Sequence, residues 1–185
     1  MKTPYNEIVN IASIGSQTNP ISLNEILRKA NDEQLTPAAQ NKERVLFLGI
    51  DVQQDFMDNG ALGVPGAHGD VERMTQFIYN NMDKITNIAV SIDTHTPHQI
   101  FHPCWWIDED GNNPAPYTPI TLADLDSGKY RAVIYPRQSR DYVEHLEKDG
   151  KKTLCVWSYH CLQGTSGAAF ENQFANMIYF HSVAK

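Results

Sequence analysis

The stretch that decides the fold is Val45-Leu-Phe-Leu-Gly-Ile50, a continuous apolar run that ends in Asp51. Such a run is typical of a strand buried on both faces, as in a parallel sheet. A second run, Asn87-Ile-Ala-Val-Ser-Ile92, ends in Asp93. Between the two runs, apolar side chains from Val71 to Ile85 recur at helical spacing. We therefore predict two parallel strands joined by a helix.

The second half of the chain continues the alternation of strands and helices. Its pattern predicts a buried strand over Thr153–Trp157, a short strand over Ala132–Tyr135, and helices over Asp141–Lys148 and from Ala168 to the end. Residues 94–128 are predicted to form a long, ordered loop rich in aromatic side chains. Together these elements predict an α/β fold with helices on the faces of a mostly parallel sheet. Ligands of such sheets bind at the carboxyl ends of the strands.

The 185 residues suffice for one full domain. Residues 1–43 are polar and lack a strong strand, so we predict an N-terminal extension there. Residues 44–185 are predicted to form the main domain. Ser22-Leu-Asn-Glu25 resembles a capping box that opens a short helix.

Composition excludes several classes of protein. The net charge of -7 argues against binding to nucleic acid, which favours a basic face. No apolar run approaches the roughly 20 residues that cross a bilayer, and the N-terminus has no signal-peptide pattern. Three cysteines are too few for a disulfide framework. We therefore expect a cytoplasmic protein that acts on no membrane.

Asp93-Thr-His95 follows the second strand directly and places two metal-capable side chains in one crevice. His160, after the third predicted strand, is placed to supply a third ligand. Carboxylate and imidazole donors suit zinc, with manganese or iron as alternatives. The alternative interpretation is a capping aspartate beside a surface histidine. His98 and His102 are nearby reserves, more typical of hydrogen bonding within the loop.

Asp51 is a candidate general base, because burying a carboxylate at a strand end is costly unless it is paired or functional. A helix-capping role is the alternative. The aromatic side chains of Phe56 and Trp157 lie near strand ends and could flank a flat ring, although core packing would explain single aromatics equally well.

The three cysteines, Cys104, Cys155 and Cys161, are weak candidates for a nucleophile. Cys161 follows His160, but neighbouring residues in an extended chain point in opposite directions. Cys155 lies within a predicted buried strand, where a small apolar role is expected. None of the three opens a predicted helix, where the pKa of a thiol is commonly lowered.

Three segments together resemble the nicotinamidase/isochorismatase-like cysteine hydrolases. They are Asp51-Val-Gln-Gln-Asp-Phe56, Ser91-Ile-Asp-Thr-His95 and Val156-Trp-Ser-Tyr-His-Cys-Leu-Gln-Gly-Thr-Ser-Gly-Ala168. Two further stretches, Gln99-Ile-Phe-His-Pro103 and Asn113-Pro-Ala-Pro-Tyr-Thr-Pro-Ile120, resemble a bacterial nicotinamidase-like branch with a longer loop. The resemblance runs from about Val45 to Lys185. It implies a three-layer α/β/α sandwich, usually assembled into oligomers, and hydrolysis of nicotinamide or a similar small amide to the acid and ammonia.

The resemblance also implies roles for single residues. Asp51 matches the base of the family's Asp-Lys-Cys triad. The metal ligands of the nicotinamidase branch match Asp93, His95 and His160. Phe56 and Trp157 match aromatics that flank the pyridine ring of the substrate.

The triad's lysine and cysteine have no counterpart in this sequence, since in the family both follow the helix that ends here. We therefore expect a chain that lacks the C-terminal part of the domain, has an incomplete sheet and is inactive by itself. It would act with a complementing C-terminal segment or in a homo-oligomer. One alternative is an inactive protein that keeps the fold to bind metal, ligand or a partner. The other is a metallohydrolase that uses a metal-activated water, with Asp51 as base.

Overall fold

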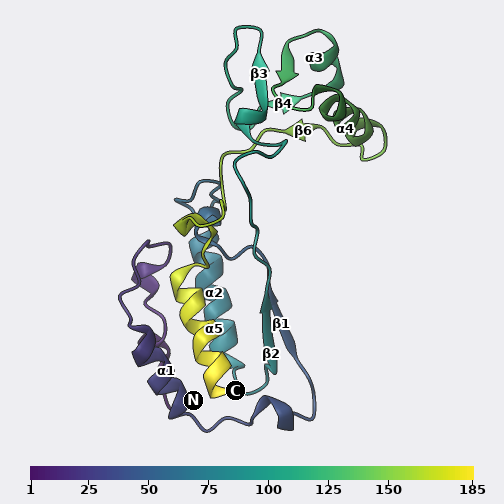
Figure 1. Ribbon diagram of the computed structural model, residues 1–185. Helices are drawn as coiled ribbons and strands as arrows, with labels where there is room; N and C mark the ends of the chain where they lie inside the picture. The colour runs from purple at the N-terminus through teal and green to yellow at the C-terminus, as the bar shows by residue number, and fades with distance from the viewer. The chain divides into compact units, whose positions relative to one another are not determined.

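The computed structural model describes residues 1–185, which form two compact units. The first comprises residues 1–94 and 164–185, and the second comprises residues 95–163. Figure 1 shows both units, each of which combines helices with short strands. The predicted mixture of helix and strand is therefore confirmed. The predicted division into an extension over residues 1–43 and a main domain over 44–185 stays a prediction.

Two parallel strands, β1 (Leu46–Gly49) and β2 (Asn87–Val90), form the sheet of the first unit. Leu46 lies opposite Asn87, and Gly49 lies opposite Val90. The helix α2 (Ala67–Asn80) joins them. The predicted strand–helix–strand unit is confirmed, and both apolar runs extend beyond the strands that they form.

Helices cover one face of this sheet. α2 lies beside α5 (Asn172–Ala184), and α1 (Leu23–Asn31) packs on α5 (Figure 1). Side chains from all three helices and from the N-terminal residues share one core, which includes Ile8, Ile26, Val71, Ile78, Phe174 and Phe180. Short 3₁₀ segments complete the unit at Tyr5–Glu7, Ile11–Ser13, Ala38–Gln40, Gln54–Phe56 and Ser166–Ala168.

The opposite face of the sheet is bare. Leu46, Leu48 and Ile50 are 60%, 57% and 63% exposed, whereas Phe47 and Ile88 pack against the core. Alternate residues of a strand point to opposite faces, so the exposed side chains share the face away from the helices. An apolar run that predicts burial on both faces is therefore buried on only one within this chain.

The N-terminal ends of α5 and α1 differ in how they are capped. Glu171 is fully buried and accepts hydrogen bonds from the amides of Gln173 and Phe174, which caps α5, and from the amide of Gly15. Burial raises the pKa of this carboxyl, and the three hydrogen bonds oppose that rise. The predicted capping box at Ser22 does not form, because its Glu25 instead makes an ion pair with Lys29.

The second unit is built on antiparallel pairs. β3 (Trp106–Asp108) pairs with β5 (Tyr130–Ala132), and β4 (Pro119–Ile120) pairs with β6 (Leu154–Cys155). A short 3₁₀ segment covers Pro103–Trp105, and helices α3 and α4 cover Leu122–Asp126 and Pro136–Lys148. Trp106, Ile120, Val143, Leu154 and Val156 form the core.

Three expectations about the strands and the long loop are wrong. Thr153–Trp157 yields only the two residues of β6, paired antiparallel, and not a third parallel strand. Residues 94–128 form β3, β4 and α3 and not one long loop. The strands form three two-stranded sheets instead of one sheet. A short apolar run predicts that its side chains are buried, but it does not indicate which strand it pairs with. The small core of the second unit buries these side chains as well as a central parallel sheet would.

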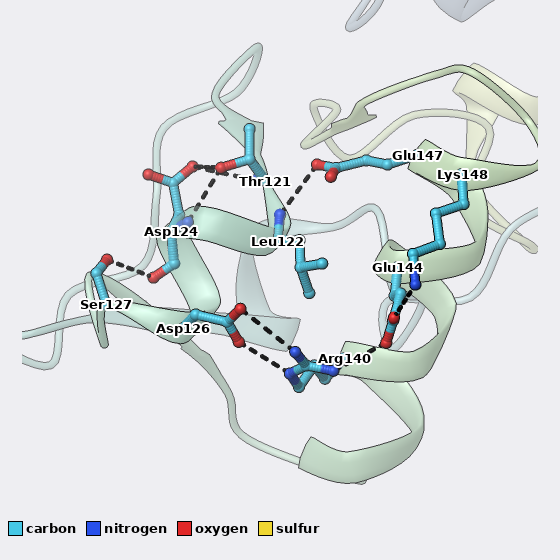
Figure 2. Close-up of polar contacts among 9 residues, drawn as sticks. All are labelled: Thr121, Leu122, Asp124, Asp126, Ser127, Arg140, Glu144, Glu147 and Lys148. Atoms are coloured by element: carbon cyan, nitrogen blue, oxygen red, sulfur yellow. Dashed lines mark hydrogen bonds and ion pairs between the residues drawn. The ribbon is translucent and has the colours of Figure 1, made fainter.

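Polar contacts join α3 to α4 (Figure 2). Thr121 and Asp124 form a reciprocal capping box at the start of α3. Arg140 on α4 donates two hydrogen bonds to the carboxylate of Asp126, at 2.9 and 3.3 Å. The amide of Leu122 donates to Glu147.

No helix of the structure is both long enough and apolar enough to cross a membrane.

Candidate functional site

Asp93 follows β2, and a buried glutamine holds its backbone in place. The amide of Asp93 donates to Gln53 Oε1 at 2.7 Å, and Gln53 Nε2 donates to the Asp93 carbonyl at 2.8 Å. Gln53 Nε2 also donates to the carbonyl of Ala168 at 2.8 Å. Gln53 is fully buried, and its role is not apparent from the sequence. A glutamine two residues after a strand-ending aspartate does not by itself indicate that its side chain holds another segment of the backbone.

His95 and His160 are brought side by side by a parallel bridge between His95 and Leu162. The amide of His95 donates to the Cys161 carbonyl at 3.0 Å, and the amide of Gln163 donates to the His95 carbonyl at 2.9 Å. The two imidazole rings lie 4.7 Å apart, centroid to centroid. Backbone hydrogen bonds between the two segments therefore place His95 beside His160.

A contact with a backbone carbonyl indicates which ring nitrogen of His160 carries the proton. Its Nδ1 lies 2.7 Å from the Ser158 carbonyl, and the side chain is buried. In an imidazole whose Nδ1–H donates to a carbonyl, Nε2 is the unprotonated nitrogen, which is the form in which histidine binds metals. His160 is thus oriented as metal-binding histidines commonly are.

Asp93, His95 and His160 together offer a set of metal ligands. One ligand atom from each lies within 4.8 Å of the other two. A single residue separates Asp93 from His95, so the chain itself places the carboxylate next to the imidazole. A carboxylate and two imidazoles form a donor set whose chemistry would suit zinc, manganese or iron.

His102 lies against the same two histidines. Its ring is fully buried, 5.8 Å from the ring of His95 and 6.0 Å from that of His160. Its Nδ1 lies 3.0 Å from the Pro97 carbonyl, and its Nε2 has no hydrogen-bond partner. Burial lowers the pKa of His102, although the Pro97 hydrogen bond opposes this shift.

Asp51 and Phe56 line one pocket of the first unit. The pocket has a volume of about 530 Å³ and is mostly apolar; it is lined by Ile50, Asp51, Val52, Phe56, Met57, Val64, Ala67, Asp70, Val71 and Met74. Asp51 has a left-handed backbone, with φ 57°. Its amide donates to Ser91 Oγ, and Ser91 Oγ donates to Asp51 Oδ1, both at 3.1 Å. These contacts aim the carboxyl of Asp51 at the end of β2.

Trp157 belongs to the second unit. Its amide donates to the Phe101 carbonyl at 2.7 Å, and its ring meets Tyr117 edge to face at 5.9 Å. The side chain is 38% exposed. An accessible indole with one face free of core packing is compatible with stacking on a flat ring.

None of the three cysteines lies in the first turn of an α-helix. Cys161 is fully buried, and burial raises the pKa of the Cys155 thiol. Cys104 Sγ lies 3.1 Å from the Pro97 carbonyl, and its amide donates to the Tyr159 hydroxyl. A nucleophilic cysteine needs surroundings that lower the pKa of its thiol. The raised pKa of the Cys155 thiol disfavours the thiolate form.

In comparisons with known proteins, no family model and no curated protein matches this chain. Yeast nicotinamidase Pnc1p, solved with the inhibitor nicotinaldehyde, is a similar structure, with a TM-score of 0.49 and 16% identity over 76% of this chain and 54% of that chain. An Acinetobacter baumanii nicotinamidase/pyrazinamidase has a TM-score of 0.43 and 19% identity over 72% and 47%. Both of these solved proteins are named as nicotinamidases. The chain spans about half the length of each.

Proposed function

We propose that this chain carries the metal site and the base of a cysteine amidohydrolase related to nicotinamidase. Such an enzyme hydrolyses nicotinamide or a similar small amide to the acid and ammonia. The convergence of Asp93, His95 and His160 is the observation that carries the proposal. The pocket that Asp51 and Phe56 line supports it, since its 530 Å³ is within the usual range for small-molecule sites.

We assign the metal to Asp93, His95 and His160, with zinc as the first choice and manganese or iron as alternatives. When bound there, a divalent ion would supply Lewis acidity for binding the ring nitrogen of a pyridine amide. Asp51 is the base that accepts the proton of an attacking cysteine thiol. Phe56 and Trp157 hold the aromatic ring by stacking.

This polypeptide by itself is proposed to bind metal and amide without turnover. We assign none of its residues to the lysine and cysteine that the resemblance implies. Cys155 and Cys161 are buried or partly buried, and the raised pKa of the Cys155 thiol disfavours the thiolate that attack requires.

The bare face of the β1–β2 sheet supports a larger assembly. Leu46, Leu48 and Ile50 expose apolar side chains there, and a contiguous apolar patch on a protein surface commonly marks an interface. We propose that a further segment of the domain, or a second copy, covers this face and completes a three-layer α/β/α sandwich. The same observation favours the second candidate function, an inactive protein that keeps the fold to bind metal, ligand or a partner.

The proposal is tested with nicotinamide and the zinc-loaded chain. Nicotinamide should bind, as followed by ligand-observed NMR, and Phe56→Ala should weaken binding by at least about tenfold, or about 1.4 kcal/mol. Phe77→Ala is the matched control, because Phe77 lies on the same helix as part of the pocket wall but is exposed. Equal affinity for wild type and Phe56→Ala would contradict the assigned pocket.

An ammonia assay on the same samples tests the proposed lack of turnover. We expect no ammonia release from nicotinamide by this polypeptide alone. Release that Asp51→Asn abolishes would show a competent active site in this chain and would refute the proposed lack of turnover. Metal binding without any nicotinamide binding would favour the second candidate.

A further inference from the structure

Tyr117 occupies a turn position that normally takes glycine. The amide of Thr118 donates to the Ala115 carbonyl at 3.2 Å, which closes a four-residue turn with Pro116 second and Tyr117 third. Tyr117 has a left-handed backbone, with φ 69°. Proline at the second position and a positive φ at the third are typical of a type II turn, whose third residue is usually glycine or asparagine. A tyrosine there is strained, because its Cβ crowds the backbone.

Backbone hydrogen bonds hold this strained residue beside the segment of Trp157. The amide of Tyr117 donates to the Val156 carbonyl at 2.5 Å, and the amide of Val156 donates to the Thr118 carbonyl at 2.9 Å. The two bonds continue the antiparallel pairing of β4 with β6 beyond the strands themselves. Strained backbone persists where the surroundings over-determine it, and it gathers at binding and active sites. The strain at Tyr117 therefore calls for an explanation in what its side chain does.

The side chain of Tyr117 forms an exposed corner with that of Trp157. The two ring centroids lie 5.9 Å apart and the ring planes meet at 89°. Tyr117 is 59% exposed and Trp157 is 38% exposed, so core packing does not explain the strained conformation. A flat aromatic ring that enters such a corner stacks on one of the two rings and meets the other edge to face. Both arrangements are favourable for aromatic pairs.

We propose that Tyr117 is a specificity-determining residue, which with Trp157 selects a flat aromatic ring in the amide substrate. The inference rests on the proposed function, in which Trp157 stacks on the substrate ring, and it adds Tyr117 to that contact. A planar heteroaromatic amide makes both aromatic contacts in the corner. A saturated ring of similar size has no π face or aromatic edge, so it makes neither.

Nicotinamide binding to the zinc-loaded full chain, followed by ligand-observed NMR, tests this assignment. Tyr117→Gly should weaken binding about three- to tenfold, because it removes one aromatic contact. Its denaturation midpoint should stay unchanged or rise, since glycine relieves the strained turn. The preference for nicotinamide over cyclohexanecarboxamide should fall by the same factor. Tyr117→Phe keeps the ring and should bind as wild type does.

Tyr135→Gly is the matched control. Tyr135 also has a left-handed backbone, with φ 49°, and is 64% exposed, but its ring lies against Trp105. Its replacement should leave nicotinamide affinity unchanged. Wild-type affinity in Tyr117→Gly, or an equal loss in Tyr135→Gly, would overturn the role of Tyr117.

A second measurement needs no variant to bind. In the wild-type complex, an intermolecular nuclear Overhauser effect should join the ring protons of nicotinamide to the tyrosine ring signal that disappears in Tyr117→Phe. Absence of this effect would also overturn the assignment. Failure of the proposed function gives a different result, which is a wild type that binds no nicotinamide. If Phe56→Ala weakens binding and Tyr117→Gly does not, the role of Tyr117 alone is wrong.

Discussion

Gln53 is the residue on which the position of Asp93 depends. Its side-chain amide pairs with both backbone groups of Asp93 and with the Ala168 carbonyl, much as a neighbouring strand would. A candidate metal ligand whose backbone is held by a fully buried side chain is pre-organised, which lowers the cost of ordering it on binding. The candidate base Asp51 is held less firmly, through the exchange of two hydrogen bonds with Ser91.

Gln53→Ala should lower the free energy of unfolding by about 2–4 kcal/mol, because it leaves buried backbone groups without partners. It should also weaken zinc binding, since Asp93 loses its anchor. Denaturant unfolding and zinc titration measure the two effects. Gln138→Ala, at an exposed position on α4, is the control and should stay within about 0.5 kcal/mol of wild type. A Gln53→Ala protein as stable as this control would contradict the anchoring role.

His181 should make stability depend on pH. It is buried on α5, its Nε2 lies 3.0 Å from the Ile85 carbonyl, and burial lowers its pKa below the usual 6.5. As the pH falls through 6.5 towards the lowered value, the unfolded chain takes up a proton that the folded chain refuses, so the free energy of unfolding decreases. Above that window the imidazole is neutral in both states.

We therefore expect His181→Gln, whose amide can still donate to Ile85, to lose less stability than wild type between pH 7.5 and 5.5. Unfolding by denaturant at several pH values measures both slopes. The comparison at pH 8 reports the packing cost of the substitution alone. Parallel pH profiles for the two proteins would show that His181 does not carry this effect.

Among the elements, β1 and β2 could be predicted because each apolar run is long, ends in an aspartate and is joined to the other by a clear helical pattern. The strand predicted over Thr153–Trp157 failed for a physical reason: the pattern measures burial, and the core around Trp106 buries Leu154 and Val156 as well as a central sheet would. Antiparallel pairing with Pro119 and Ile120 depends on contacts distant in sequence.

The candidate site was predicted to a similar extent. Asp93, His95 and His160 could be named from strand ends, and the structure brings them together, although their role stays a prediction. The role of Gln53 could not be predicted. It depends on which backbone groups lie opposite the side chain, and no local pattern encodes that.

The capping box of α3 should matter for the second unit. Thr121→Ala removes the side-chain oxygen that accepts from the Asp124 amide (Figure 2), which should cost about 1 kcal/mol. Hydrogen exchange at the Asp124 amide should accelerate, because that amide loses its partner. Thr153→Ala, at an exposed position, is the control and should leave this exchange rate unchanged. Equal rates in all three proteins would show that the cap does not hold the helix.

For the whole molecule, the bare sheet face is the feature that most needs a partner. Leu46, Leu48 and Ile50 belong to a run whose composition is typical of burial on both faces, yet helices cover only one. Leu46 and Leu48 lie within β1 and Ile50 directly follows it, so the exposure of the two leucines is a property of the sheet.

The wild-type chain should therefore self-associate in sedimentation equilibrium as its concentration rises. Leu46→Lys with Leu48→Lys should raise the dissociation constant at least about tenfold, because it places two charges on the face that associates. Val133→Lys, at an exposed apolar position of the second unit, is the control. A wild type that stays monomeric, or one that the Val133 change disrupts equally, would contradict association through this face.

Zinc stoichiometry is the measurement that tests the central claim most directly. Equilibrium dialysis of the full chain against Zn²⁺ should give one tightly bound ion for wild type and for the control His98→Ala, which replaces an exposed histidine. The double substitution His95→Ala with His160→Ala should abolish tight binding while circular dichroism stays that of a folded chain. One tightly bound ion in the folded double variant, or none in wild type, would contradict the metal site on which the account rests.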